Sequence, residues 1–242
     1  MKILIVNDDG LQAAALPLLI RWARKLGDVT CVVPKIEQSG KSQAIDFLHP
    51  VEIREVSIAE DISVWAMDST PADCVRFGVT GLNASYDLIL SGINRGYNLG
   101  HDIAYSGTVG AINEGGRLGI PAIALSCDVG ALDEAMGMLD HWWEFMQTSG
   151  LLDKGSLYNV NFPHCPTPKG IRVTRQGGEF YSDAFEYRGG NLYMQVGAPI
   201  PRKGCDLTVD IDAVFAGYIS VTPMAWERMD PLVYEAVKDI AE

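Results

Sequence analysis

The start of the chain alternates short apolar runs with a helical segment, and this order constrains the fold most. Residues 2–6 form an apolar run typical of a buried strand, and residues 13–26 have helical periodicity. A second β-like run covers residues 29–33, and we expect Pro34 to end it. This order predicts a βαβ unit, in which two parallel strands are joined by a helix packed on the sheet.

The alternation continues through residue 146. Thr70 and Pro71 are typical of a helix start, with a side-chain cap followed by proline in the first turn. The expected elements are exposed strands or a hairpin within 44–56, a strand at 62–67, a helix from 70 to about 78 or 81, strands at 88–90 and 122–125, and helices at 109–118 and 132–146. The pattern therefore predicts an α/β fold with a mostly parallel sheet and helices on both faces.

The pattern changes at residue 157. Beyond it, β-like runs alternate with Pro and Gly, and helical periodicity returns only in the last ten residues. The runs lie at 158–162, 171–174, 192–196 and 218–221. We therefore divide the chain into an α/β core at 1–156 and a β-rich extension at 157–242. The extension covers the site, packs on the sheet or forms an oligomer interface, and the pattern leaves these three uses open.

Composition excludes several classes of protein. A net charge of −12 argues against a nucleic-acid partner or an anionic membrane surface, both of which need clustered Lys and Arg. No apolar run approaches the roughly 20 residues of a membrane-spanning helix, and the first strand starts too early for a secretory leader. The five cysteines are scattered without metal or disulfide spacing, so we expect a reduced, cytoplasmic protein.

Two adjacent carboxylates, Asp8 and Asp9, follow the first strand. Two such charges about 4 Å apart repel by roughly 4 kcal/mol at an effective dielectric near 20. A divalent cation removes that repulsion, and Asp with neutral Asn or Ser oxygens suits Mg²⁺ or Mn²⁺. The alternative is that one of the two residues simply caps the following helix.

A Gly-rich loop at 91–108 links a strand to a helix. Its Ser106, Gly107 and Thr108 fall at the helix start, where unpaired N–H groups favour a phosphate group. The alternative is an ordinary turn with a Ser or Thr cap. An acidic chain that binds phosphate opposes its own field, which again predicts a local cation.

Three further polar residues follow strands at the same predicted edge of the sheet. Ser39 is placed to reach the same cation, while Asn94 and Asn98 offer oxygens for a metal or amide donors for phosphate. Each also has a simpler interpretation as a turn residue. His101, in the Gly-rich loop, is a weaker candidate for an acid or base.

The motifs together resemble the SurE survival-protein family of 5′/3′-nucleotidases, in the same order and over nearly the whole chain. The matching segments are 5–10 (IVNDDG), 38–40 (QSG), 70–75 (TPADCV), 91–94 (SGIN), 105–109 (YSGTV), 159–163 (NVNFP), 210–213 (DIDA) and 217–223 (GYISVTP). The resemblance implies a Rossmann-like, three-layer core with a β-rich C-terminal extension used for oligomerisation.

The resemblance also implies a cytoplasmic, metal-dependent phosphatase that hydrolyses nucleoside 5′- and 3′-monophosphates by attack of an activated water. Short-chain polyphosphate is a further substrate of some members, and the enzymes are homodimers or homotetramers with one Mg²⁺ or Mn²⁺ per subunit. By position, the metal ligands would be Asp8, Asp9, Ser39 and Asn94, with the two aspartates catalytic. The phosphate-binding residues would be Asn98, Ser106, Gly107 and Thr108.

This chain departs from the family pattern at four positions: Leu11, Gln12, Asp46 and Ser69. Leu11 and Gln12 replace smaller residues after the Asp-Asp-Gly turn, which alters the expected shape of the pocket.

Two rival functions use the same residues. A phosphatase with Asp8 as covalent nucleophile is one, although such enzymes usually space their two aspartates by one residue. A phospho-acceptor receiver domain is the other, but Ser91 and Gly92 occupy the stretch where its acceptor aspartate should lie.

Overall fold

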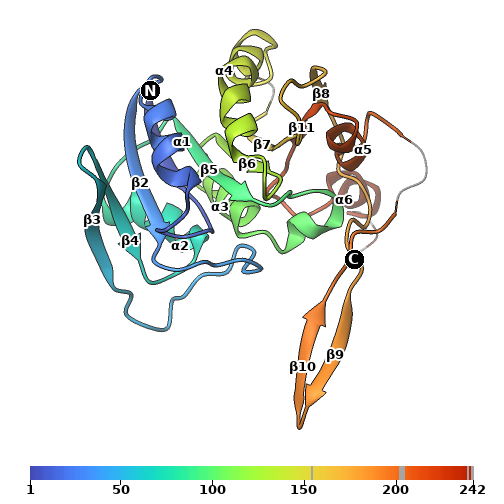
Figure 1. The fold of residues 1–242 in the computed structure, drawn as a ribbon, viewed down its shortest axis with the longest axis horizontal. Helices are drawn as coiled ribbons and strands as arrows, with labels where there is room; N and C mark the ends of the chain where they lie inside the picture. Colours follow the sequence, from blue (N-terminus) through green and yellow to red (C-terminus); the bar gives the residue numbers. More distant parts are fainter. Residues whose placement is uncertain (154, 202–204, 239, 241–242) are drawn as a thin grey trace.

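The computed structural model of the protein describes residues 1–153, 155–201, 205–238 and 240. A nine-stranded sheet with the order β3-β4-β2-β1-β5-β6-β7-β11-β8 runs through its centre (Figure 1). Its strands are β1 (Lys2–Val6), β2 (Asp28–Pro34), β3 (Ile53–Ala59), β4 (Ile62–Met67), β5 (Leu88–Arg95), β6 (Ala122–Cys127), β7 (Leu157–Phe162), β8 (Ile171–Val173) and β11 (Ile219–Pro223). A separate hairpin of β9 (Ala184–Gly189) and β10 (Leu192–Val196) extends away from it.

The central strands are parallel and buried. Parallel pairing links β4 to β2, β2 to β1, β1 to β5, β5 to β6 and β6 to β7. Every residue of β6 and β7 is buried, as expected where helices cover both faces of a parallel sheet. Antiparallel pairs occur only toward the edges of the described sheet, between β3 and β4 and between β7 and β11.

Helices cover both faces. On one face, α1 (Ala15–Ala23) and α4 (Leu132–Thr148) share a hydrophobic core with the sheet that includes Trp22 and Trp142. On the other, α2 (Pro71–Arg76) and α3 (Gly107–Arg117) form a second core with Val75 and Ile112. The three layers confirm the predicted α/β class with a mostly parallel, Rossmann-like sheet. No helix in the described part of the chain is both long and apolar enough to cross a membrane.

The order of the strands reverses between β1 and β5. From β1 the chain moves to β2 on one side, and later returns to place β5 on the other side of β1. At such a switch point the two connections leave on opposite faces, and a crevice opens beyond the carboxyl ends of the strands. The residues that follow β1 and those that end β5 therefore meet in this crevice.

Several predicted boundaries were wrong. The first helix spans only Ala15–Ala23 because Lys25 to Gly27 turn tightly into β2. Pro34 is the last residue of β2 rather than the residue after it, and β3 begins at Ile53. The β5 strand continues to Arg95, so residues 91–95, including Asn94, lie in the strand and not in the Gly-rich loop predicted at 91–108. The β9 strand and α5 (Asp210–Phe215) were not predicted, whereas α6 (Pro231–Val237) falls in the helical C-terminal stretch.

Three strands from beyond residue 156, β7, β8 and β11, belong to the main sheet.

Candidate metal and phosphate site

Asp8 is the point where three segments of the crevice meet. It follows β1 and is 4% exposed. Its Oδ1 accepts a 2.5 Å hydrogen bond from the Thr108 hydroxyl at the start of α3. Its main-chain oxygen accepts a 2.7 Å hydrogen bond from the Gln38 N–H in the loop after β2. The structure therefore brings Asp8 together with two of the loops predicted to share the site.

Asp9 joins β1 to β5. Its Oδ2 accepts a 3.0 Å hydrogen bond from the main-chain N–H of Arg95, the last residue of β5. Neither aspartate caps the following helix, because the N-cap of α1 is Ala14 and no side chain caps that end. The helix-cap alternative for this pair is therefore wrong.

The two carboxylates lie in an environment that opposes their negative charge. The pKa of Asp8 is raised to about 6 in total: burial is the largest cause, the charge of Asp9 adds to it, and the Thr108 hydrogen bond opposes both. Burial also raises the pKa of Asp9. The hydrogen bond from the Arg95 N–H lowers this pKa, and the charge of Glu37 raises it. A cation bound between them would relieve this electrostatic cost.

The side chains of Ser39 and Asn94 have oxygens suited to a hard cation. The Ser39 hydroxyl donates a 2.7 Å hydrogen bond to Glu37 Oε1, which leaves its lone pairs for a metal. The Asn94 amide Nδ2 donates a 2.9 Å hydrogen bond to the Gly96 carbonyl, and its Oδ1 is left as an acceptor for a metal. Within the described residues no group of three or more His, Cys, Asp or Glu could hold a metal. A site here would therefore combine two carboxylates with neutral oxygens, a donor set that fits Mg²⁺ or Mn²⁺.

The N-terminus of α3 lies directly against Asp8. Ser106 is the N-cap, and its Oγ accepts a 3.1 Å hydrogen bond from the Val109 N–H. The N–H groups of Gly107 and Thr108 belong to the first helical turn, which has no carbonyl partners within the helix. A Cβ on Gly107 would lie 2.9 Å from Asp8 Cβ and 3.0 Å from Asp8 Oδ2, so only glycine permits this approach.

Asn98 is built into the framework of the loop. Its Nδ2 donates a 2.8 Å hydrogen bond to Ser126 Oγ, and its main-chain N–H donates to Asn161. Its carbonyl accepts from the side chains of Asn159 and Asn161. These bonds fix the Gly-rich loop to β6 and β7, and the phosphate-binding role of Asn98 stays a prediction. His101 is exposed, in a 3₁₀ turn at Gly100–Ala104.

Two further residues support the site, and the sequence analysis gave neither of them a role there, although Asp210 belongs to the matching segment 210–213. Glu37 accepts the hydrogen bond of the Ser39 hydroxyl and so orients it. The only signal in the sequence was that a carboxylate lies two residues before Ser39. Asp210 accepts hydrogen bonds from the N–H groups of Gly100 and Gly177, 2.9 and 2.8 Å long, and so fixes the loop to the C-terminal segment.

Fold and site together define a class: a doubly wound α/β protein with an acidic, oxygen-lined crevice at the switch point of its sheet, beside a helix N-terminus. Comparison with known proteins narrows this class. The family model described as survival protein SurE matches residues 3–183, and the chain belongs to that family.

The similarity extends over nearly the whole chain. The 5′-nucleotidase SurE of Paramagnetospirillum magneticum is 41% identical over 240 residues, covering 94% of this chain and 90% of that protein. The 5′-nucleotidase SurE of Thermosipho melanesiensis is 39% identical over 236 residues, covering 93% and 91%. The crystal structure of the SurE protein from Aquifex aeolicus matches with a TM-score of 0.83 and 32% identity over 100% of both chains.

Proposed function

We propose that this protein is a metal-dependent phosphatase that hydrolyses nucleoside 5′- and 3′-monophosphates, with short-chain polyphosphate as a further substrate. The observation that carries the proposal is the junction at Asp8, where an acidic strand end lies against the N-terminus of α3. Relatives named 5′-nucleotidase over more than nine-tenths of the chain support the nucleotide as substrate.

We assign one Mg²⁺ or Mn²⁺ per subunit to the oxygens of Asp8, Asp9, Ser39 and Asn94. The support is chemical, because each side chain keeps an oxygen available while a neighbour holds it in place. When bound, such an ion neutralises phosphoryl oxygens and lowers the pKa of a water molecule.

The residues of the chain then have distinct tasks. The α3 N–H groups at Gly107 and Thr108 and the Ser106 hydroxyl bind phosphoryl oxygens and stabilise the charge that grows on them. Asp9, held by Arg95, accepts a proton from the attacking water. The new P–O bond forms from that water, the ester P–O bond breaks, and the departing alkoxide takes a proton from solvent.

The alternative of a covalent phospho-Asp8 is disfavoured by burial. Asp8 is 4% exposed and its Oδ1 is engaged by Thr108. Covalent catalysis would leave a radiolabelled phosphoenzyme after acid quenching, whereas direct attack of water leaves none.

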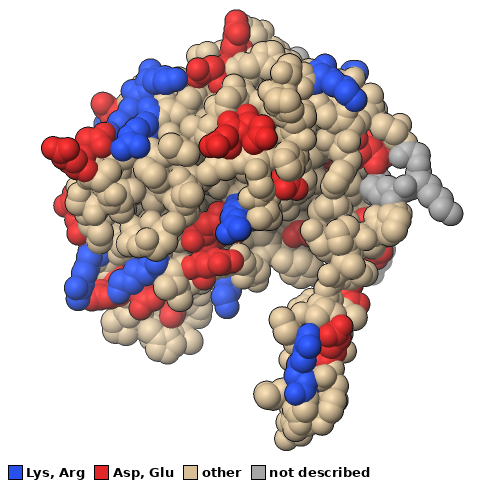
Figure 2. Space-filling view, viewed as in Figure 1, with Lys and Arg blue, Asp and Glu red and all other residues tan. Residues whose placement is uncertain are grey.

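The oligomer is assigned to the β9–β10 arm, within the extension at 157–242. Phe185, Tyr187, Leu192, Tyr193 and Met194 on this arm are all more than half exposed. In Figure 2 the end of the arm is free of charged atoms on the side shown, while basic and acidic atoms cover part of its upper half. Such a surface favours a homodimer or homotetramer. The cysteines are all free, which favours a reducing compartment such as the cytoplasm.

Release of inorganic phosphate tests the function. We expect AMP, GMP and their 3′ isomers to be hydrolysed with Mg²⁺ or Mn²⁺. Bis(p-nitrophenyl) phosphate, a diester, serves as the control and should not be hydrolysed. Failure to release phosphate from any nucleoside monophosphate with either metal would contradict the proposal.

A further inference from the structure

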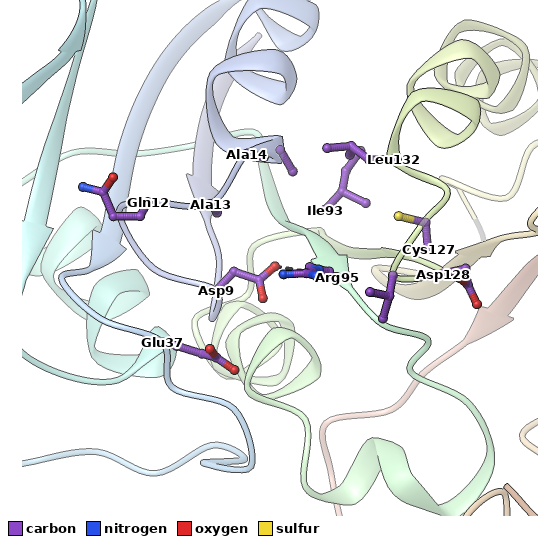
Figure 3. A pocket seen from close by; sticks show the side chains of 12 residues that line it. Asp9, Gln12, Ala13, Ala14, Glu37, Ile93, Arg95, Cys127, Asp128 and Leu132 are labelled. Atoms are coloured by element: carbon purple, nitrogen blue, oxygen red, sulfur yellow. Dashed lines mark hydrogen bonds between the residues drawn. The ribbon is translucent and has the colours of Figure 1, made fainter.

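A pocket opens beside Asp9, on the face of the sheet covered by α1 and α4. It encloses about 380 Å³, within the roughly 300–1,000 Å³ range of small-molecule sites. Its lining includes Asp9, Gln12, Arg95, Cys127, Asp128 and Val129. Figure 3 shows the side chains of Asp9 and Arg95 extending toward one another within this pocket. We call this cavity the switch-point pocket, because it lies where β1, β5 and the loop after β6 meet.

The two walls of the switch-point pocket differ in chemistry. One is apolar, with Ile93 at 1% and Cys127 at 2% exposed. It also includes the more exposed Val129, and Leu132 at the start of α4. The other presents Gln12 and the exposed Arg95. Asp128 at the rim is fixed by the Gly130 N–H, 3.1 Å away, and by His164 Nδ1, 3.4 Å away. A flat heterocycle with polar edges suits walls of this kind.

The charges in the pocket disfavour a second phosphate group. Asp9, Glu37 and Asp128 contribute carboxylates, against the guanidinium of Arg95. The N-terminus of α3, which favours an anion, packs with α2 on the opposite face of the sheet. Asp9 belongs both to the metal site and to the pocket lining. A single ligand would therefore place its phosphate at α3 and its neutral part in the pocket.

We propose that the switch-point pocket binds the nucleoside part of a nucleoside monophosphate, with the base between the Arg95 guanidinium and the apolar wall. The guanidinium stacks on the face of the base, and Gln12 and Asp128 are placed to exchange hydrogen bonds with its edge. This inference rests on the proposed nucleotidase function. It makes Arg95 and Val129 specificity-determining residues for the base rather than for the phosphate.

A second cavity, lined by Tyr97, Tyr105 and Tyr181, is the competing location. It is wider, at about 630 Å³, and Asp9 is not among its lining residues. Its tyrosines at 105 and 181 are 63% and 44% exposed, so they offer no enclosed slot for a base. The switch-point pocket is therefore the better fit.

The test compares AMP with ribose 5-phosphate, which carries the same phosphate ester and sugar without a base. Arg95→Ala keeps the main-chain N–H that holds Asp9, and Val129→Ser removes only an exposed part of the apolar wall. We expect kcat/KM for AMP to fall about tenfold in the first variant and about fivefold in the second, mainly through KM. The kcat/KM for ribose 5-phosphate should fall clearly less than that for AMP in Arg95→Ala, where only the loss of a positive charge beside Asp9 affects it, and should change less than twofold in Val129→Ser. Binding of adenosine, measured by equilibrium dialysis, should weaken in parallel.

Arg54→Ala on β3 and Val173→Ser on β8 are the matched controls, since both residues are exposed and far from the pocket in the sheet order. They should change neither substrate. Equal losses for AMP and ribose 5-phosphate would assign Arg95 to the phosphate, and unchanged kinetics for both would place the base elsewhere; either result overturns the inference. If the wild-type protein releases phosphate from neither compound, it is the nucleotidase function itself that fails.

Discussion

The main-chain N–H of Arg95 binds Oδ2 of Asp9 at 3.0 Å, across 86 residues of sequence. The bond joins the carboxyl ends of β1 and β5, the two strands on either side of the switch point. Because the donor belongs to the backbone of a central strand, the Asp9 carboxylate is oriented before any ligand binds. Among the described residues Oδ1 of Asp9 has no hydrogen-bond partner, so it is available to a cation or a water.

Replacing Asp9 with Asn should lower kcat for AMP by about 10²- to 10⁴-fold. The amide has the same shape, but it neither accepts a proton from water nor neutralises a cation. Steady-state phosphate release, with circular dichroism to check the fold, measures the effect. Asp61→Asn, at an exposed carboxylate paired with Arg24, is the control and should be neutral. Turnover of Asp9→Asn within threefold of wild type would remove Asp9 from the mechanism.

Removal of divalent metal should abolish activity reversibly. With EDTA in excess, phosphate release from AMP should drop to background, and added Mg²⁺ or Mn²⁺ beyond the chelator should restore it. The melting temperature should rise when the metal returns, since the ion relieves repulsion between Asp8 and Asp9. Undiminished activity in chelator would refute the metal requirement.

Gly107→Ala should weaken catalysis by crowding Asp8. The added Cβ would lie 2.9 Å from Asp8 Cβ, so either the carboxylate or the start of α3 must shift. We expect at least about tenfold loss of kcat/KM, since small misplacement of reacting groups is costly. Gly137→Ala is the matched control, because a Cβ there meets nothing within 4 Å in α4, and it should raise stability by about 0.5–1 kcal/mol. Normal activity in Gly107→Ala would show that Asp8 is not held as we describe.

Glu114 should give the protein a pH-dependent contribution to stability. Its side chain is 3% exposed and binds Arg76 and Arg117 across α2 and α3. Burial alone raises its pKa, but hydrogen bonds from Arg117, Gln43 and Arg76 outweigh burial, and the net shift is below the ordinary value of 4.5. The stabilisation is therefore present above pH 4.5 and is lost as the pH falls through the lower folded pKa.

Urea unfolding of Glu114→Gln against wild type measures this contribution. At pH 7 the variant should be less stable by about 1–3 kcal/mol, because two guanidinium groups lose their charged partner. The difference should shrink as the pH falls below 4.5, the ordinary pKa. A difference that stays constant down to pH 3 would show that the ionised carboxylate is not its source.

Charging the β9–β10 arm should separate the subunits. Tyr187 and Tyr193 pair across the hairpin with ring centroids 5.4 Å apart, and both are more than 60% exposed. Glu at both positions should yield a monomer in light scattering while the melting temperature of the core is kept. A double Glu variant at Ser57 and Ser63, an exposed cross-strand pair on the β3–β4 hairpin, should keep the wild-type mass. An unchanged oligomer in the arm variant would place the interface elsewhere.

The core of the fold could be predicted because its elements carry strong local signals. The β1 strand and the first three residues of β5 are apolar runs, β6 is mostly apolar, and Thr70 caps α2 with its side chain as predicted. By contrast, β9 was missed although residues 185–188 alternate apolar and polar side chains, a run of only four residues with no buried face. The α5 helix is six residues long, too short for a helical period to emerge. The β3 arm starts at Ile53 because its pairing partner β4 sets the register, a tertiary cause that no local pattern reveals.

The candidate site could be located from sequence, but its internal contacts could not. The strand-end positions of Asp8, Asp9 and Asn94 follow from strand assignment and the switch-point rule. The close packing of Gly107 on Asp8 and the hydrogen bond from the Arg95 N–H to Asp9 depend on how segments distant in the sequence meet. Asn98 illustrates the limit, because its partners Ser126 and Asn161 lie on β6 and β7.

Anomalous diffraction from crystals soaked in Mn²⁺ tests the proposed metal site directly. We predict one strong manganese peak per subunit, bonded to carboxylate oxygens of Asp8 and Asp9 and within coordination distance of Ser39 Oγ and Asn94 Oδ1. The Asp9→Asn crystals, soaked in the same way, should lose or weaken that peak. A manganese peak away from these side chains, or none at saturating Mn²⁺, would contradict the site on which the proposed catalysis depends.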